Sequence, residues 1–123
     1  MLSFTPLELA ALNSIFQETP VIAHSLTAQL GAATPIERVN SGAGFFTTIS
    51  VPSDAPPVAG PSVLGKETSV RVSGLEYGLG FVLFMADGRL SKLEGYSYGE
   101  STNLLNLDNI VPHVFRAPNN RTS

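Results

Sequence analysis

The dipeptide Asp87-Gly88 constrains the fold of this chain more than any other sequence feature. It lies between an apolar segment, GFVLFMA at 80–86, and a mixed segment, RLSKLEGY at 89–96. Asp and Gly accept the positive φ angles of a two-residue type I′ turn, so the pattern predicts an antiparallel β-hairpin. The first strand is apolar on both faces and should be central in a sheet, whereas the mixed second strand should lie nearer an edge.

A regular hairpin also determines which residues lie opposite one another. Counting back from a two-residue loop places Phe81 opposite Glu94. Side chains repeat every two residues along a strand, so Glu94, Tyr96 and Tyr98 share one face. The hairpin therefore predicts a carboxylate and two phenols in a row, next to Phe81.

The first helix begins at a capping box. Thr5 stands three residues before Glu8 with Pro6 between them, so each of the two side chains can accept from the other residue's backbone amide. Apolar residues at helical spacing follow, and we predict a helix over 6–17.

A second helix is predicted over 20–30. Thr19-Pro20 repeats the cap-then-proline pattern, and an apolar stripe begins at Val21. Gly31 stands where a glycine commonly ends a helix.

From about residue 35 the apolar pattern changes from helical to alternating. Strands are predicted over IERVNS at 36–41, GFFTTISV at 44–51 and TSVRVSG at 68–74, in addition to the hairpin, with a proline-rich loop at 52–62. Helices first and strands afterwards indicate an α+β fold, with two N-terminal helices packed on one face of an antiparallel sheet of about five strands. We expect residues 1–116 to form a single domain and residues 117–123 to be a frayed tail.

Composition and charge restrict the partners and the compartment. The chain has 123 residues, a net charge of −3, no cysteine, and seven scattered Lys and Arg residues. It therefore has no basic stripe for nucleic acid. No apolar run approaches the roughly 20 residues that span a bilayer, and Glu8 interrupts the apolar N-terminus where a signal peptide would be uncharged. We expect a cytoplasmic protein that binds neither nucleic acid nor membranes.

Few residue patterns in the chain suggest chemistry. His24 and His113 stand in no metal-ligand spacing, so we expect no metal site and no cofactor. The letters GYSYG at 95–99 match G-x-S-x-G, but a nucleophile elbow needs a strand, a sharp turn and a helix in a parallel sheet. The G-x-G pairs at 42–44 and 78–80 lack the rest of a phosphate loop. We expect no catalytic residue.

The segment LSKLEGYSYGE at 90–100 is the best candidate for a functional site. It brings together Glu94, Tyr96, Tyr98 and Glu100, and the regular register adds Phe81. Tyrosine is enriched where interfaces are energetic, so the cluster predicts a binding surface. A second interpretation stays open, in which the tyrosines only cap the edge of a sheet with their hydroxyls in water.

The stretch GLGFVLFMADGRLSKLEGYSYGE at 78–100 resembles a hairpin shared by a group of short bacterial proteins without an established function. The shared pattern is G-F-x-L-F-x-x-D-G-x-L-x-x-L-E-G-Y-x-Y-G-E, and GAGFFTTISVPSDAP at 42–56 is similar to the group's earlier strand and loop. The resemblance implies kinship over about half of the chain and no particular reaction. Small acidic domains without cysteine also occur among toxin-immunity proteins, which is an analogy of size and charge.

The residues support three functional hypotheses. The favoured one is a non-catalytic cytoplasmic binding protein, in its most concrete form an immunity-like inhibitor, that uses an acidic and aromatic strand edge. The second is a small-molecule-binding protein or modest enzyme with a pocket between helices and sheet, where Glu94 is the acid or base and Tyr96 a hydrogen-bond donor. The third is a homodimer in which the tyrosine-rich edge strand pairs with itself. The partner is accordingly a protein, either a different one or a second copy.

Overall fold

The computed structural model describes residues 2–110 and 113–116 and contains two helices followed by an antiparallel sheet. The elements are α1 Pro6–Gln17, α2 Ala23–Ala32, β1 Thr34–Asn40, β2 Gly44–Ser50, β3 Val63–Leu64, β4 Thr68–Val72, β5 Leu75–Ala86, β6 Arg89–Ser97, the 3-10 helix Leu107–Asn109, and β7 His113–Arg116. The predicted α+β fold is confirmed. Residues 117–123, which we expect to fray, lie outside the described residues.

The sheet places the tyrosine-rich strand in its interior. Six strands lie in the order β1-β2-β6-β5-β4-β7, and the two-residue β3 pairs with β5 beyond the end of β4. Strand β6 is hydrogen-bonded to β2 on one side and to β5 on the other. The prediction that it lies near an edge is wrong, because the β1–β2 hairpin joins the sheet along the side of β6 that the second hairpin leaves open.

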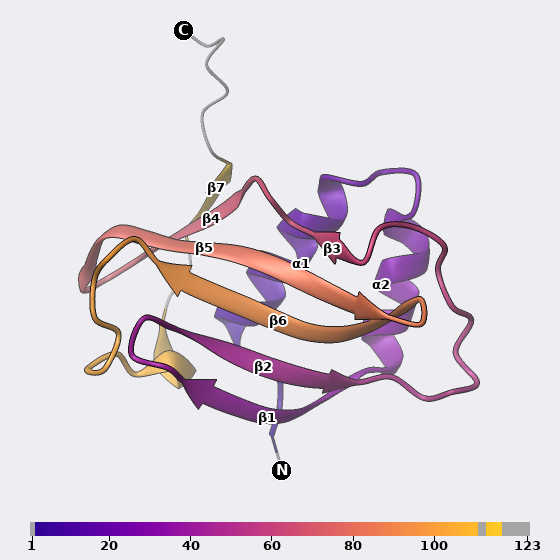
Figure 1. Ribbon diagram of the computed structural model, residues 1–123, viewed down its shortest axis with the longest axis horizontal. Coiled ribbons are helices and arrows are strands. Elements are labelled where there is room, and N and C mark those ends of the chain that lie inside the picture. Colours follow the sequence, from indigo (N-terminus) through magenta and orange to yellow (C-terminus); the bar gives the residue numbers. More distant parts are fainter. Residues whose placement is uncertain (1, 111–112, 117–123) are drawn as a thin grey trace, which may run out of the picture.

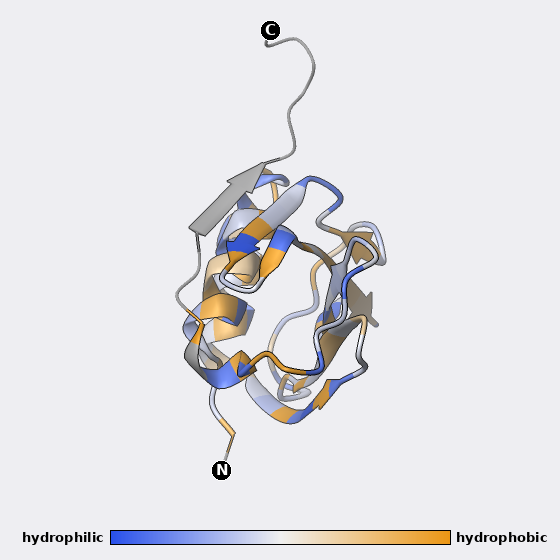
Figure 2. Cartoon of the chain, turned by 90° about the vertical axis from the view of Figure 1, so that its left-hand side faces the viewer, coloured by the Kyte–Doolittle hydropathy of each residue, from blue (hydrophilic) through white to orange (hydrophobic). Residues whose placement is uncertain are grey.

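Both helices lie on one face of the sheet, as predicted. In Figure 1 the viewer looks onto the strands with the helices behind them, and Figure 2 shows the two layers from the side. Helix α1 contacts β4, β5 and β7, and α2 contacts β6. We call the face toward the helices the inner face and the opposite one the outer face. The core lies between the inner face and the helices, and its fully buried members include Leu7, Leu12, Ile15, Leu26, Phe45, Phe81, Leu83 and Leu93.

Helix α1 begins at the predicted capping box. The Thr5 hydroxyl accepts from the Glu8 amide at 3.1 Å, and the Glu8 carboxylate accepts from the Thr5 amide at 2.9 Å. The helix covers 6–17 as expected, because the cap satisfies two of the amides that the first turn leaves without intrahelical partners.

Helix α2 does not begin where the sequence predicts. The Thr19 hydroxyl donates to the Phe16 carbonyl at 3.3 Å, so it closes the end of α1 and caps nothing downstream. Residues 20–22 form a turn, in which Val21 is 95% exposed. Gly31 lies inside α2, which continues to Ala32.

A buried ion pair attaches α1 to the sheet. Arg38 in β1 donates from Nε to Oε2 of Glu8 and from Nη2 to Oε1 of Glu8, each at 2.7 Å. The Thr47 hydroxyl of β2 donates to the same carboxylate. Glu8 is fully buried, and the Arg38 side chain is 9% exposed. The side-chain hydrogen bonds to Glu8 raise the pKa of Arg38.

Helix α2 is attached to the hairpin turn by one side chain. The Gln29 amide donates to the Gly88 carbonyl at 2.8 Å and to the Pro56 carbonyl at 3.0 Å, and it accepts from the Leu90 amide at 3.0 Å. These bonds hold the turn and the proline-rich loop against α2, away from the outer face. In the described part of the chain, no helix is long and apolar enough to cross a membrane.

Candidate functional site

The hairpin has the predicted turn and a register that the sequence does not predict. Asp87 and Gly88 have φ angles of 53° and 77°, as a type I′ turn requires. The two pairs next to the turn, Ala86 with Arg89 and Met85 with Leu90, are as predicted. The next residue, Ser91, then forms a β-bulge, so Phe84 pairs with Lys92. The bulge shifts every later pair by one position.

The shift separates Phe81 from the candidate cluster. Phe81 pairs with Gly95, and the expectation that it lies beside Glu94 is wrong. Its ring is fully buried on the inner face, where it meets the ring of Phe45 edge-on at a centroid distance of 5.9 Å. A Cβ on Gly95 would lie 2.8 Å from the Phe81 ring and 2.9 Å from the Phe45 ring, so glycine lets both rings fill the core. Glu94 and Tyr96 accordingly lie on the outer face.

The outer face carries three rows of side chains that run across the strands. Cross-strand pairing gives the rows Glu37, Thr48, Lys92, Phe84 and Val63, then Val39, Phe46, Glu94 and Val82, and then Gly44, Tyr96, Gly80 and Ser69. Eight members of these rows are half-buried, and we define the outer-face patch as all of them except the small Thr48, namely Val39, Phe46, Val82, Phe84, Lys92, Glu94 and Tyr96. Five of the seven are apolar or aromatic, and no helix covers them (Figure 1).

Two opposite charges lie in the middle of the outer-face patch. The Lys92 ammonium lies 5.2 Å from the ring centroid of Phe46 and 5.4 Å from that of Phe84, so it covers both rings as a cation–π contact. Within residues 2–110 and 113–116, the Glu94 carboxylate makes no hydrogen bond or ion pair. The two groups share a strand and a face, yet they do not pair with each other.

Tyr96 lies flat against the sheet because a neighbouring strand carries glycine there. A Cβ on Gly80 would lie 2.4 Å from the Tyr96 ring, so only glycine leaves room for it. Tyr98 meets Tyr96 edge-on at 5.5 Å, with its hydroxyl 3.4 Å from that of Ser69. Burial raises the pKa of Tyr96, and the Tyr98 hydroxyl and the Glu94 carboxylate add to the effect.

Glu100 has a partner of its own within the chain. Its carboxylate accepts from the Glu76 amide at 3.0 Å and from the Tyr77 amide at 3.1 Å. It thus ties the segment after β6 to the beginning of β5, beside and not within the outer-face patch. Of the predicted residues, the structure brings together Glu94, Tyr96 and Tyr98, with Glu100 beyond them and Phe81 on the other face.

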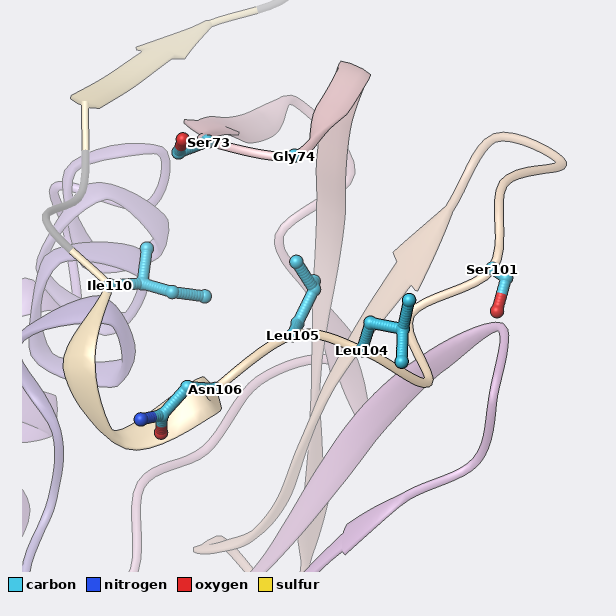
Figure 3. A pocket seen from close by; sticks show the side chains of 7 residues that line it. All are labelled: Ser73, Gly74, Ser101, Leu104, Leu105, Asn106 and Ile110. Atoms are coloured by element: carbon cyan, nitrogen blue, oxygen red, sulfur yellow. The ribbon is translucent and has the colours of Figure 1, made fainter.

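Three surface hollows lie among the described residues, and their lining residues do not include Glu94, Tyr96 or Tyr98. The largest, at 640 Å³, lies between the β4–β5 turn and the segment 101–110, and Leu105 points across it toward Gly74 (Figure 3). The described residues that line it are Ser73, Gly74, Ser101, Leu104, Leu105, Asn106 and Ile110, and none of these seven is charged. A hollow of 350 Å³ includes Arg38 and Asp108, and one of 370 Å³ includes His24 and Asp54. Glu94 and Tyr96 face away from the helices, so neither points into the space between helices and sheet.

The sequence contained one signal for the outer-face patch. Phe45 and Phe46 are adjacent in β2, and β5 is apolar on both faces, so aromatic side chains must point to both sides of the sheet. Two short helices can cover only one of those sides. Phe46 and Phe84 could therefore have been identified from this excess of apolar residues.

Comparison with known proteins gives no relative: no protein-family model, no curated protein and no solved structure matches this chain.

Proposed function

We propose that this chain is a non-catalytic binding protein, and that the outer-face patch binds another protein. The observation that carries the proposal is an aromatic and aliphatic surface on the side of the sheet that the helices leave uncovered. An antiparallel sheet with one face in water ordinarily reads polar on that face. A contiguous apolar surface with a few charges marks an interaction site instead.

The position of the patch also suits binding. Val39 projects from the edge strand β1, and the other six of its seven side chains project from β2, β6 and β5, which are interior strands paired on both sides. Such strands hold Phe46, Phe84 and Tyr96 in place before a partner arrives, which lowers the entropy cost of association. Aromatic side chains such as these three are enriched at the centres of interfaces.

A narrower form of the proposal takes the partner to be a toxin and the protein to be an immunity-like inhibitor in the cytoplasm. Its support is the small size, the net charge of −3 and the lack of cysteine. The broader proposal does not depend on it.

A pull-down from the native lysate tests the binding function. The bait is the full chain, compared with Phe46→Ala/Glu94→Ala, and Val21→Ala serves as the control because Val21 is exposed on the turn before α2, off the outer face. We expect a stoichiometric partner that the control retains and the double variant loses, with circular dichroism showing that all three are folded. A folded double variant that keeps every partner would rule out the outer-face patch as the binding surface.

A further inference from the structure

We propose that the protein seated on the outer-face patch is a second copy of this chain, packed face to face about a two-fold axis. The inference rests on the proposed function and names the partner. It differs from the self-pairing of an edge strand, which β6 cannot undergo because both of its sides are already paired.

The charges of the outer-face patch select the partner. Lys92 and Glu94 have opposite signs and stand two residues apart, or about 7 Å along the strand. A partner that offers only cations would be repelled by Lys92, and one that offers only anions would be repelled by Glu94. The fitting partner carries the same two charges at the same spacing in the reverse order, and a second copy does so by symmetry.

A single axis satisfies both charges. It lies between the two sheets, runs perpendicular to β6 and passes over Leu93. Rotation by half a turn brings Lys92 over Glu94 of the second copy, and Glu94 over Lys92 of the second copy. Stacked sheets lie about 10 Å apart with their strands within about 30°, so the long side chains can meet across the gap.

The same axis gives complementary shapes next to the charges. Phe84 pairs with Lys92 and Val82 with Glu94, so the rotation places the Phe84 ring over Val82 of the second copy. Phe46 likewise comes to lie over Thr48 of the second copy, since Thr48 pairs with Lys92 and Phe46 with Glu94. Each large ring meets a smaller side chain, which lets the two faces interdigitate.

The free edge at β1 is a poorer surface for self-association. Pro35 cannot donate a hydrogen bond, and an irregularity at Ile36 interrupts its pairing with β2. Charged Glu37 follows on the exposed strand. Proline, bulges and charge are the features that prevent edge strands from pairing with another chain.

Analytical ultracentrifugation of the full chain over a micromolar concentration series tests the inference. We expect wild type to be a dimer, and we expect Lys92→Glu and Glu94→Lys each to raise the dimer dissociation constant at least about tenfold, because each variant opposes like charges. An equimolar mixture of the two single variants should form a heterodimer, and the double variant Lys92→Glu/Glu94→Lys should dimerise again. Recovery in the mixture also shows that both single variants are folded.

Three outcomes would overturn the inference. They are a wild type that is monomeric throughout the series, single variants that dimerise as tightly as wild type, and a mixture that stays monomeric. Only the pull-down bears on the broader proposal: a monomeric protein that still captures a different partner through Phe46 and Glu94 would keep the binding function and exclude the second copy as its partner.

Discussion

Glu8 is a single polar residue on which the fold depends strongly. Its carboxylate is fully buried and bonded to Arg38, Thr5 and Thr47. Glu8→Gln keeps an acceptor for the capping box but replaces the buried anionic partner of Arg38 and leaves it the exposed Asp108 carboxylate at 3.4 Å, so we expect a loss of about 3 kcal/mol in urea unfolding. The double variant Glu8→Gln/Arg38→Met should be less destabilised than Glu8→Gln. A single variant within about 1 kcal/mol of wild type would contradict this account.

Tyr96 should give the protein a loss of stability at high pH. Its pKa is raised, so the folded protein holds the phenolic proton more tightly than the unfolded chain does. The resulting stabilisation is fully present below the ordinary tyrosine pKa of 10.0 and is lost as the pH rises through the folded pKa. We expect Tyr96→Phe to lose less stability than wild type between about pH 9 and about pH 11 in urea unfolding. Tyr77→Phe, a change at an exposed tyrosine, should follow wild type.

Single residues also show where sequence reasoning ends. The capping role of Glu8 could be predicted because Thr5 is three residues away, but its ion pair could not, because Arg38 is brought to it only by the packing of α1 on the sheet. Ser91 carries no mark of a bulge in the sequence. One unpredicted residue there moved Phe81 away from Glu94 and turned Val82 toward it.

At the scale of elements, Gln29 bonds α2 to both the hairpin turn and the proline-rich loop, which the Val58 amide and Arg89 also join to each other. Gln29→Ala keeps the helix propensity and removes three hydrogen bonds, one of them to the buried Leu90 amide. We expect a loss of about 2 kcal/mol in urea unfolding and faster proteolysis within residues 52–58. Gly31→Ala in the same helix is the control, because a Cβ there meets nothing within 4 Å and should leave stability unchanged or raised. Equal proteolysis of Gln29→Ala and wild type would contradict the attachment.

The elements themselves were predictable where a local sequence pattern is compatible with only one structure. The capping box started α1 and the Asp-Gly pair made its turn, since each depends on residues a few positions apart. Thr19 had two uses, and its bond to the Phe16 carbonyl made it the end of α1. Strand β3 has two residues and exists only because β5 extends past β4, so no local pattern could reveal it.

At the scale of the whole molecule, Phe45 and Phe46 are adjacent in sequence and point to opposite faces of the sheet, so substitutions at the two positions measure how much each face contributes to stability. Phe45 is 1% exposed in the core, whereas Phe46 lies in the outer-face patch. We expect Phe45→Ala to lose about 3 to 5 kcal/mol and Phe46→Ala only about 1 kcal/mol, measured by urea unfolding where the protein is monomeric. Comparable losses would mean that the outer face is covered.

The arrangement of layers followed from the order of elements, but the strand order did not. Helices before strands indicated α+β, and two helices limited the cover to one face. That the β1–β2 hairpin docks against β6 depends on contacts between residues far apart in the chain, such as Phe46 with Glu94. Those contacts moved the tyrosines from an edge to the middle of the sheet.

The pairing of β2 with β6, which we call the seam, joins the β1–β2 hairpin to the β5–β6 hairpin. Each hairpin can form from residues close in sequence, whereas the seam cannot, and this difference affects how the protein behaves on heating. If the seam opens first, two strand edges become free in the same molecule. One of them carries FFTTI at 45–49, which is uncharged, free of proline and rich in residues that favour strands. We expect irreversible aggregation on heating to start from that segment, so the solubility of the protein in storage depends on one long-range strand pairing staying closed.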